Sequence, residues 1–108
     1  MPIPEITHLQ FLVLRTIAGR PMPGRELREK LGVEVAKKSL PAFYQMMSRL
    51  EDAGLVRGSY ETKVINGQRI QERWYQVTAL GTKAANDAID FYTSTASAAA
   101  NLREVPRA

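Results

Sequence analysis

The chain has 108 residues, of which 44% are hydrophobic and 24% charged, and this size predicts one compact domain. It contains no cysteine, which excludes disulfides and sulfur-bound zinc, and neither a signal peptide nor a membrane span fits, so we expect a cytoplasmic protein. The net charge is +4, and residues 25–73 hold ten Lys or Arg against seven acidic residues. This basic excess either attracts polyanions or only reflects a solvated surface that happens to be basic.

The N-terminal part of the chain predicts two helices. Apolar residues recur at helical spacing between Thr7, which suits an N-cap, and Gly19, and this indicates a mostly buried helix. His8 lies at its exposed start, where a surface role is far more frequent than a functional one. After a loop over residues 20–23, the stretch Gly24–Leu31 predicts a short helix.

The stretch from Ser39 to Ala53 predicts the helix around which the chain is organised, with Ser39 as N-cap and Gly54 after its end. We expect one face to be buried, and its residues are Leu40, Phe43, Met47 and Leu50. The opposite face carries residues that can stack or form hydrogen bonds, namely Pro41, Tyr44, Gln45, Ser48, Arg49 and Asp52. Two helices joined by the link 33–38 form the pattern of a helix-turn-helix unit.

Two lysines precede this helix, and a hairpin follows it. Lys37 and Lys38 lie where a phosphate would gain from both their charge and the helix N-terminus. Asn66-Gly67 separates two segments rich in β-branched and aromatic residues, which predicts a two-stranded hairpin over residues 55–77. A two-residue loop would oppose Tyr60 to Arg73 and Gly58 to Tyr75, but it would also oppose Glu61 to Glu72, so we expect a bulge or a longer loop to shift the outer half.

A helix-turn-helix followed by a hairpin is a winged helix, so the predicted fold class is α+β and mostly helical. Residues 1–77 would form the DNA-binding winged helix-turn-helix, and residues 78–108 a C-terminal dimerisation helix and tail. A helix from Ala79 to about Leu102 would be roughly 36 Å long and would project beyond the domain. We expect its apolar stripe to contact a second copy of the chain through Ala84, Ala88, Ile89, Phe91, Tyr92 and Ala96. The alternative is that the last fifteen residues fray or are disordered, because Thr93–Ser97 is poor in helix formers.

Three motifs in order resemble a known family over about residues 9–85. The first is Gly24-Arg25-Glu26-Leu27, similar to Gly-Tyr-Glu-Leu. The second runs through Phe43-Tyr44, Arg49-Leu50-Glu51 and Gly54-Leu55-Val56, similar to a tyrosine, Arg-Leu-Glu and Gly-Leu-Ile. The third is Arg73 to Thr78 followed by Leu80-Gly81, similar to Tyr-Tyr-x-Leu-Thr-x-x-Gly. The chain thus resembles the PadR-type winged-helix transcriptional regulators.

The resemblance implies a dimeric repressor of the short subgroup with a single C-terminal helix, which sets the recognition helix Ser39 to Ala53 in the major groove of double-stranded DNA. Tyr44 would lie near a phosphate, and Arg25 replaces a helix-two tyrosine that faces the DNA backbone. Gln45 and Pro41 depart from the family pattern, so its operator preference does not transfer. Some short members bind flat hydrophobic compounds between their subunits, which would make a small hydrophobic effector a further partner.

The candidate DNA-binding residues fall into two groups by the part of DNA they would contact. Those assigned to phosphates are Arg25, Lys37, Lys38, Tyr44 and Arg69, and those nearest to base edges are Gln45, Ser48 and Arg49; Ser39, Lys63 and Gln68 complete the set. Two alternatives stay open: Arg49 could pair with Glu51 or Asp52 or bond a backbone carbonyl, and Lys63, Gln68 and Arg69 could only solubilise the hairpin.

A protein-interaction module without DNA readout is the second hypothesis for the whole chain. The modest net charge and the acidic Glu51 and Asp52 beside the recognition helix favour it. An enzyme is not expected, because the sequence has one histidine, no cysteine and no glycine-rich phosphate loop. We accordingly predict neither a cofactor nor a metal site.

Overall fold

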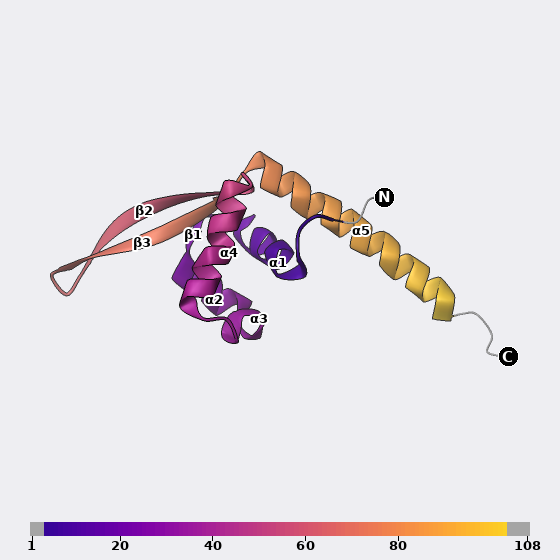
Figure 1. Cartoon of the computed structure of the whole chain (residues 1–108), viewed down its shortest axis with the longest axis horizontal. Coiled ribbons are helices and arrows are strands. Elements are labelled where there is room, and N and C mark those ends of the chain that lie inside the picture. Colours follow the sequence, from indigo (N-terminus) through magenta and orange to yellow (C-terminus); the bar gives the residue numbers. More distant parts are fainter. Residues whose placement is uncertain (1–3, 104–108) are drawn as a thin grey trace.

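The computed structural model describes residues 4–103. Its elements are α1 (His8–Ile17), β1 (Met22–Pro23), α2 (Gly24–Leu31), α3 (Val33–Ala36), α4 (Leu40–Asp52), β2 (Val56–Ile65), β3 (Gln68–Val77) and α5 (Ala79–Arg103). The first four helices form one body, from which the β2–β3 hairpin and the far part of α5 project to opposite sides (Figure 1). The predicted α+β winged helix with a hairpin wing is confirmed.

The caps that the sequence predicts are present at the main helices. The Thr7 hydroxyl accepts a hydrogen bond from the Gln10 amide at 3.1 Å, and the Gln10 side chain accepts one from the Thr7 amide at 2.9 Å. The Ser39 hydroxyl accepts from the Ala42 amide at 3.2 Å and begins α4. Gly54, with φ of 76°, ends α4 in the left-handed conformation. Local sequence therefore fixes where these helices start and stop.

Two short elements lie where the sequence predicts only a loop and a link. β1 pairs with β3, with Met22 opposite Tyr75, and makes a three-stranded antiparallel sheet in the order β1-β3-β2. The two prolines of residues 20–23 indicate a loop, but Met22 is buried in the core, and Pro23 is tolerated because β1 is a sheet edge. The helix α3 replaces the expected link because Val35 packs into the core.

The wing is a regular hairpin, and the bulge expected in its outer half is absent from the described residues. Asn66 and Gly67 both have positive φ, and the pairing runs without interruption from Val56 opposite Val77 to Ile65 opposite Gln68. Glu61 does lie opposite Glu72. The like charges are tolerated because two cations, described below, contact Glu72.

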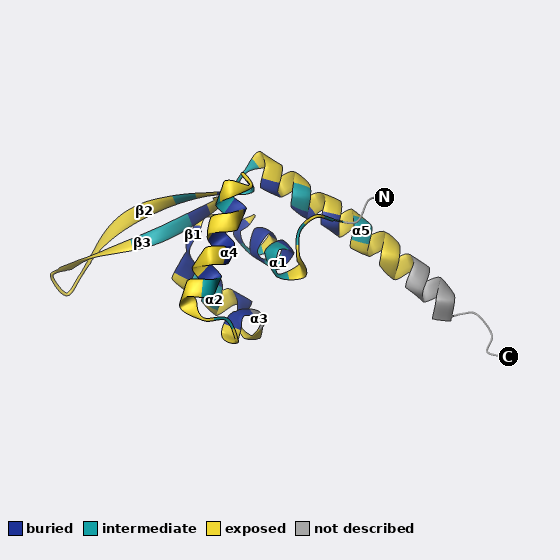
Figure 2. Cartoon of the chain, viewed as in Figure 1, coloured by how far each residue is buried: buried dark blue, intermediate teal, exposed yellow. Residues whose placement is uncertain are grey.

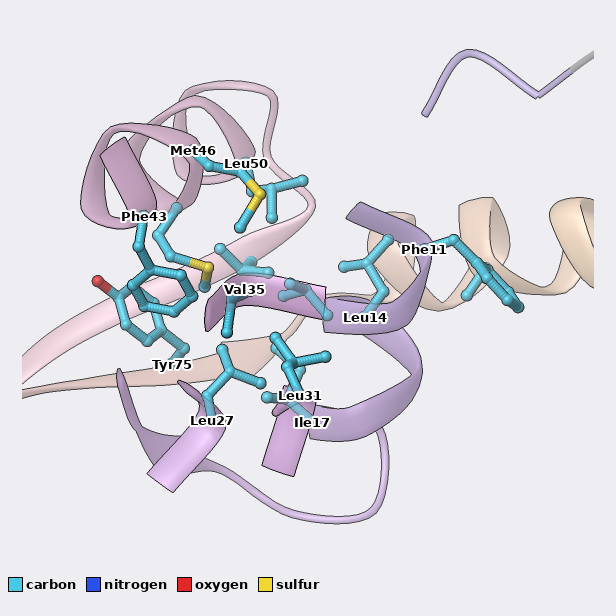
Figure 3. Packing of buried hydrophobic residues seen from close by; sticks show 14 of the residues in the cluster. Phe11, Leu14, Ile17, Leu27, Leu31, Val35, Phe43, Met46, Leu50 and Tyr75 are labelled. Atoms are coloured by element: carbon cyan, nitrogen blue, oxygen red, sulfur yellow. The ribbon is translucent and has the colours of Figure 1, made fainter. Parts of the chain in front are cut away.

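The hydrophobic core lies where α1, α2, α3 and α4 meet the base of the sheet. Figure 2 shows buried residues in the first four helices, at the base of the sheet and in the near part of α5, while the outer wing is exposed. Figure 3 shows side chains of α1, α2 and α4 converging with Tyr75 of β3. The prediction that Leu40 is buried is wrong: it is 56% exposed, because it is the first residue of α4, and Met46 is instead buried at 8% exposure.

α5 packs on its own domain first and then projects. The Thr78 hydroxyl accepts from the Gly81 amide at 3.0 Å and donates to the Gly54 carbonyl at 2.6 Å, so one side chain links the ends of α4 and of the wing to the start of α5. The Tyr92 ring lies 5.9 Å from the Phe11 ring of α1. The helix continues through residues 93–97 and ends at Arg103, so the described part of the last fifteen residues is helical, and residues 104–108 lie outside the described ones.

Gly81 allows α5 to start close against the end of α4. A Cβ at this position would collide with the carbonyl oxygen of Leu55 and would press on a Val77 methyl group. We expect Gly81→Ala to lower the free energy of unfolding by about 1–3 kcal/mol, as overpacking usually does. Gly19→Ala is the matched control, because no atom lies within 4 Å of a Cβ there. Chemical denaturation of both variants measures the difference, and equal stabilities would contradict the close approach.

Candidate nucleic-acid interface

The polar face of α4 is open to solvent. Gln45 and Ser48 are exposed, and within residues 4–103 no hydrogen bond or ion pair engages their side chains. Tyr44 lies beside them, and its ring stacks edge-on against Phe43 with centroids 5.1 Å apart. A helix face of this kind can enter the major groove, where amide and hydroxyl groups reach base edges.

Tyr44 also covers the start of α2. A Cβ on Gly24 would lie 2.8 Å from the Tyr44 hydroxyl oxygen, so the glycine leaves room for the ring. This places the hydroxyl next to the N-terminal end of α2, whose free amides and dipole favour an anion. The position suits the predicted contact with a phosphate.

A groove of about 510 Å³ runs between α4 and the wing. Its lining residues are Tyr44, Ser48, Glu51, Tyr60, Gln71, Arg73 and Tyr75. Sequence reasoning named only the first two as site residues and missed the contribution of the wing. The period of two along a strand could have found it, because the predicted pairing already set Tyr60 opposite Arg73 on one face.

An ion pair crosses this groove and connects α4 to the wing. The Arg73 guanidinium donates to a Glu51 carboxylate oxygen at 2.5 Å and lies over the Tyr60 ring, 4.6 Å from its centroid. Gly58 has no side chain to obstruct the pair. The hydrogen bond to Glu51 raises the pKa of Arg73, and burial together with the Glu51 charge raises the pKa of Tyr75, so Arg73 is charged and Tyr75 neutral at pH 7.

Of the three residues predicted at the wing tip, Arg69 lies on one face of the hairpin, and Lys63 and Gln68 lie on the other. Arg69 alternates with Gln71 and Arg73 and therefore shares the face of the groove. Lys63 and Gln68 belong to the other face. There the Lys63 amine lies 3.3 Å from Glu72 and 6.0 Å from the centre of the Trp74 ring. Arg69 is thus the wing cation best placed to act together with α4.

Arg25 is held loosely by carboxylates at the start of α2. Its guanidinium lies 3.4 Å from Glu72 and 3.7 Å from Glu29, and its side chain is 58% exposed. Desolvation raises the pKa of Glu72, but the hydrogen bonds and charges of Lys63 and Arg25 together lower it below its usual value. Glu72 therefore keeps these contacts above its ordinary pKa and loses them only as the pH falls through the lowered value.

The remaining candidates lie at the two ends of α4. Lys37 is exposed and Lys38 half-buried just before the helix, beside Ser39, whose oxygen already accepts the capping hydrogen bond. Arg49 lines a second cavity of about 530 Å³, with Glu5 and Asp87 also in its wall, while Glu51 binds Arg73 instead. Arg49 is therefore set apart from the groove that holds Tyr44 and Ser48.

Comparison with solved structures identifies the fold. No family model and no curated protein matches the chain. A PadR-like transcriptional regulator from Bacillus cereus superposes with a TM-score of 0.72 at 18% identity over 91% of this chain and 93% of that one. A PadR family transcriptional regulator from Eggerthella lenta gives 0.72 at 20% identity over 91% and 83%, and one from Clostridium difficile gives 0.71 at 13% over 89% and 98%. The chain has the PadR fold.

In this PadR fold, the predicted dimerisation residues of α5 separate into two sets. Ala88 is fully buried in the chain's own core, and Ala84 is half-buried against it. The two side chains therefore pack within the chain, in contrast to the prediction that they contact a second copy. Ile89 is 43% exposed, and Tyr92 and Ala96 are exposed as well. Phe91 is half-buried, and its ring lies 5.5 Å from that of Tyr92. An outward apolar face remains around Ile89.

Two further properties of the described residues concern metal ions and the membrane. Residues 4–103 contain no group of three His, Asp or Glu side chains that could hold a metal ion. Within the same range, no helix is long and apolar enough to cross a membrane.

Proposed function

We propose that this chain is a cytoplasmic PadR-type transcriptional regulator that binds double-stranded DNA as a dimer with α4 in the major groove. The observation that carries the proposal is the exposed polar face of α4, bounded by Lys37 at one end and by the groove of the wing along its side. Its structural neighbours are named as transcriptional regulators and not as enzymes, and the proposal includes no catalysis.

The DNA backbone next to α4 would pass over the groove between α4 and the wing. A duplex with α4 in its major groove brings one phosphate strand between the recognition helix and a wing that reaches the next minor groove. Tyr44, Ser48 and Gln71 supply hydrogen-bond donors along this path, and Arg69 supplies a charge farther out. Gln45 then faces the base edges.

The proposal includes repression of transcription and its relief by a small hydrophobic effector. A dimer on an operator that overlaps a promoter would exclude polymerase, as the PadR resemblance implies. The 530 Å³ cavity is lined mainly by apolar groups such as Ile6, Leu50 and Leu80, and it joins the end of α4 to the start of α5. A small hydrophobic effector in this cavity would contact both the recognition helix and the proposed dimer helix.

Selection of duplexes from a random pool tests sequence-specific binding. We expect enrichment of an inverted repeat whose half-sites lie about 10 base pairs apart, or a multiple of that spacing, because a two-fold dimer presents its two recognition helices to the same face of the duplex. A pool that shows no enrichment after repeated rounds would contradict sequence-specific binding.

Arg25 is expected to contribute backbone contacts only. Its carboxylate partners are distant and its side chain is exposed, so a phosphate can replace them. Replacing Arg25 by Ala should weaken binding to all duplexes alike and reduce the slope of log affinity against log salt by about one per subunit. Fluorescence anisotropy at several salt concentrations measures both quantities. A loss confined to the selected sequence would contradict a phosphate role.

Protein docking is the second candidate, and the exposed aliphatic residues Val64, Ile65 and Ile70 near the wing tip favour it. Such residues on a projecting hairpin could contact a partner protein and not a duplex. The two functions predict different results for the selection experiment, since a docking module would leave the pool unenriched.

A further inference from the structure

The floor of the groove between α4 and the wing holds a cation that is already neutralised. Arg73 and Glu51 are joined at 2.5 Å, and the exposed fractions of their side chains are 29% and 21%. The Tyr60 ring flanks the guanidinium, and Gly58 makes room for both groups. A DNA backbone in the groove would therefore pass over an arginine whose charge is balanced by a carboxylate.

The Glu51–Arg73 pair differs from the ion pairs of Arg25, another arginine near the proposed DNA path. Arg25 lies 3.4 Å or more from its acids and is 58% exposed, so water and phosphates reach it readily. Arg73 has a short, half-buried hydrogen bond to an ionised group, and charge-assisted bonds of this kind are about twice as strong as neutral ones. Because the Arg25 pairs are longer and Arg25 is more exposed, a phosphate replaces the carboxylates of Arg25 more readily than it displaces Glu51 from Arg73.

We propose that Glu51 masks Arg73 from the DNA backbone and thereby limits the affinity of the protein for DNA of any sequence. The inference rests on the proposed function, since it assigns a positioning role within the same interface. Each phosphate that a cation neutralises adds about 0.9 to the slope of log affinity against log salt. Glu51 would thus keep one such contact per subunit from forming, and it would hold the wing at a fixed position relative to α4.

The isosteric variant Glu51→Gln tests the proposal in the full-length chain. Gln can still accept the hydrogen bond from Arg73, but it leaves the positive charge unbalanced. We expect anisotropy titrations with a mixed-sequence duplex to show a salt slope steeper by about 0.9 per subunit and a several-fold higher affinity at low salt. The selected duplex should show the same gain, so that sequence preference does not change.

Two further variants attribute the gain to Arg73. Adding Arg73→Gln to the Glu51→Gln chain should return the salt slope to that of the wild type, because the new contact belongs to this guanidinium. Asp52→Asn is the matched control: it removes the neighbouring acid of the same helix, which is exposed. Its salt slope should stay at the wild-type value, whereas a slope that rises as in Glu51→Gln would overturn masking of a particular arginine.

Other outcomes would overturn the inference in distinguishable ways. If the wild type binds DNA and Glu51→Gln has the same salt slope as the wild type, the inference is wrong but the proposed function still holds. A changed base preference makes Glu51 a reader of cytosine. Thermal unfolding checks whether Glu51→Gln folds, and if it does not, the single variant Arg73→Gln tests the proposal. A salt slope equal to that of the wild type supports masking, whereas a slope lower by about 0.9 per subunit overturns it. A wild type that binds no duplex removes both proposals.

Discussion

Replacing Gln45 by alanine is expected to abolish most of the sequence preference while sparing the affinity for mixed-sequence DNA. Gln45 is exposed in the middle of the polar face of α4, and a glutamine there can form two hydrogen bonds with an adenine edge. The loss should be about 1–3 kcal/mol per half-site on the selected duplex. Anisotropy titrations of the selected and the mixed-sequence duplex measure the two affinities side by side.

Gln76→Ala is the matched control for this prediction. Gln76 is also an exposed glutamine, but it belongs to β3 and lies on the face of the hairpin that is turned from the groove. We expect its affinities for both duplexes to equal those of the wild type. If Gln45→Ala weakens binding on all sequences by the same factor, Gln45 is a backbone contact and another residue of α4 reads the bases.

Placing an aspartate at Ile89 is expected to produce a monomer that binds DNA at least about 100-fold more weakly. Ile89 is exposed beside Tyr92 on the apolar face of α5, and a buried charge without a partner is strongly unfavourable in an interface. Two linked half-site contacts give an affinity about 10² to 10⁴ times that of one. Light scattering measures the mass, and anisotropy on the selected duplex measures the loss.

Ser94→Asp adds the same charge to another part of the same helix and serves as the control. Ser94 is exposed, and it lies about 140° around the helix axis from Ile89. It should leave both mass and affinity unchanged. A dimer that persists in Ile89→Asp would show that this face is not the interface.

Those parts of the fold that depend on local chemistry could be predicted from the sequence. Ser39 caps α4, and Gly54 ends it with a positive φ, as their residue types require. Asn66-Gly67 sets a two-residue turn, and that turn alone fixes the pairing of the whole wing. The repulsion between Glu61 and Glu72 predicts a bulge that does not form, because Arg25 and Lys63 contact Glu72, and local sequence does not show the contact from Arg25.

Those parts that depend on distant contacts could not be predicted from local pattern. β1 exists because Met22 pairs with Tyr75, more than 50 positions later in the chain, against the local preference of two prolines for a loop. Leu40 is exposed because it is the first residue of α4 and this start of the helix lies at the surface, whereas Met46, which was not predicted to be buried, packs into the core.

The candidate site shows the same division between local and distant information. The polar face of α4 follows from helical periodicity, and Gln45 and Ser48 lie on it as predicted. The separation of Lys63 from Arg69 follows from strand alternation, because the two residues lie on opposite faces of the hairpin. The Glu51–Arg73 pair joins residues of two elements, and only their packing brings the two side chains together.

Binding of the full-length chain to a mixed-sequence duplex, titrated at several salt concentrations while the mass in solution is measured, is the experiment to do first. We expect a dimer whose affinity falls steeply with salt, with a log-log slope that corresponds to several phosphates. A protein that binds no duplex even at low salt would contradict DNA binding through α4 and the wing, and the exposed wing tip and α5 would then be the surfaces on which to look for a protein partner.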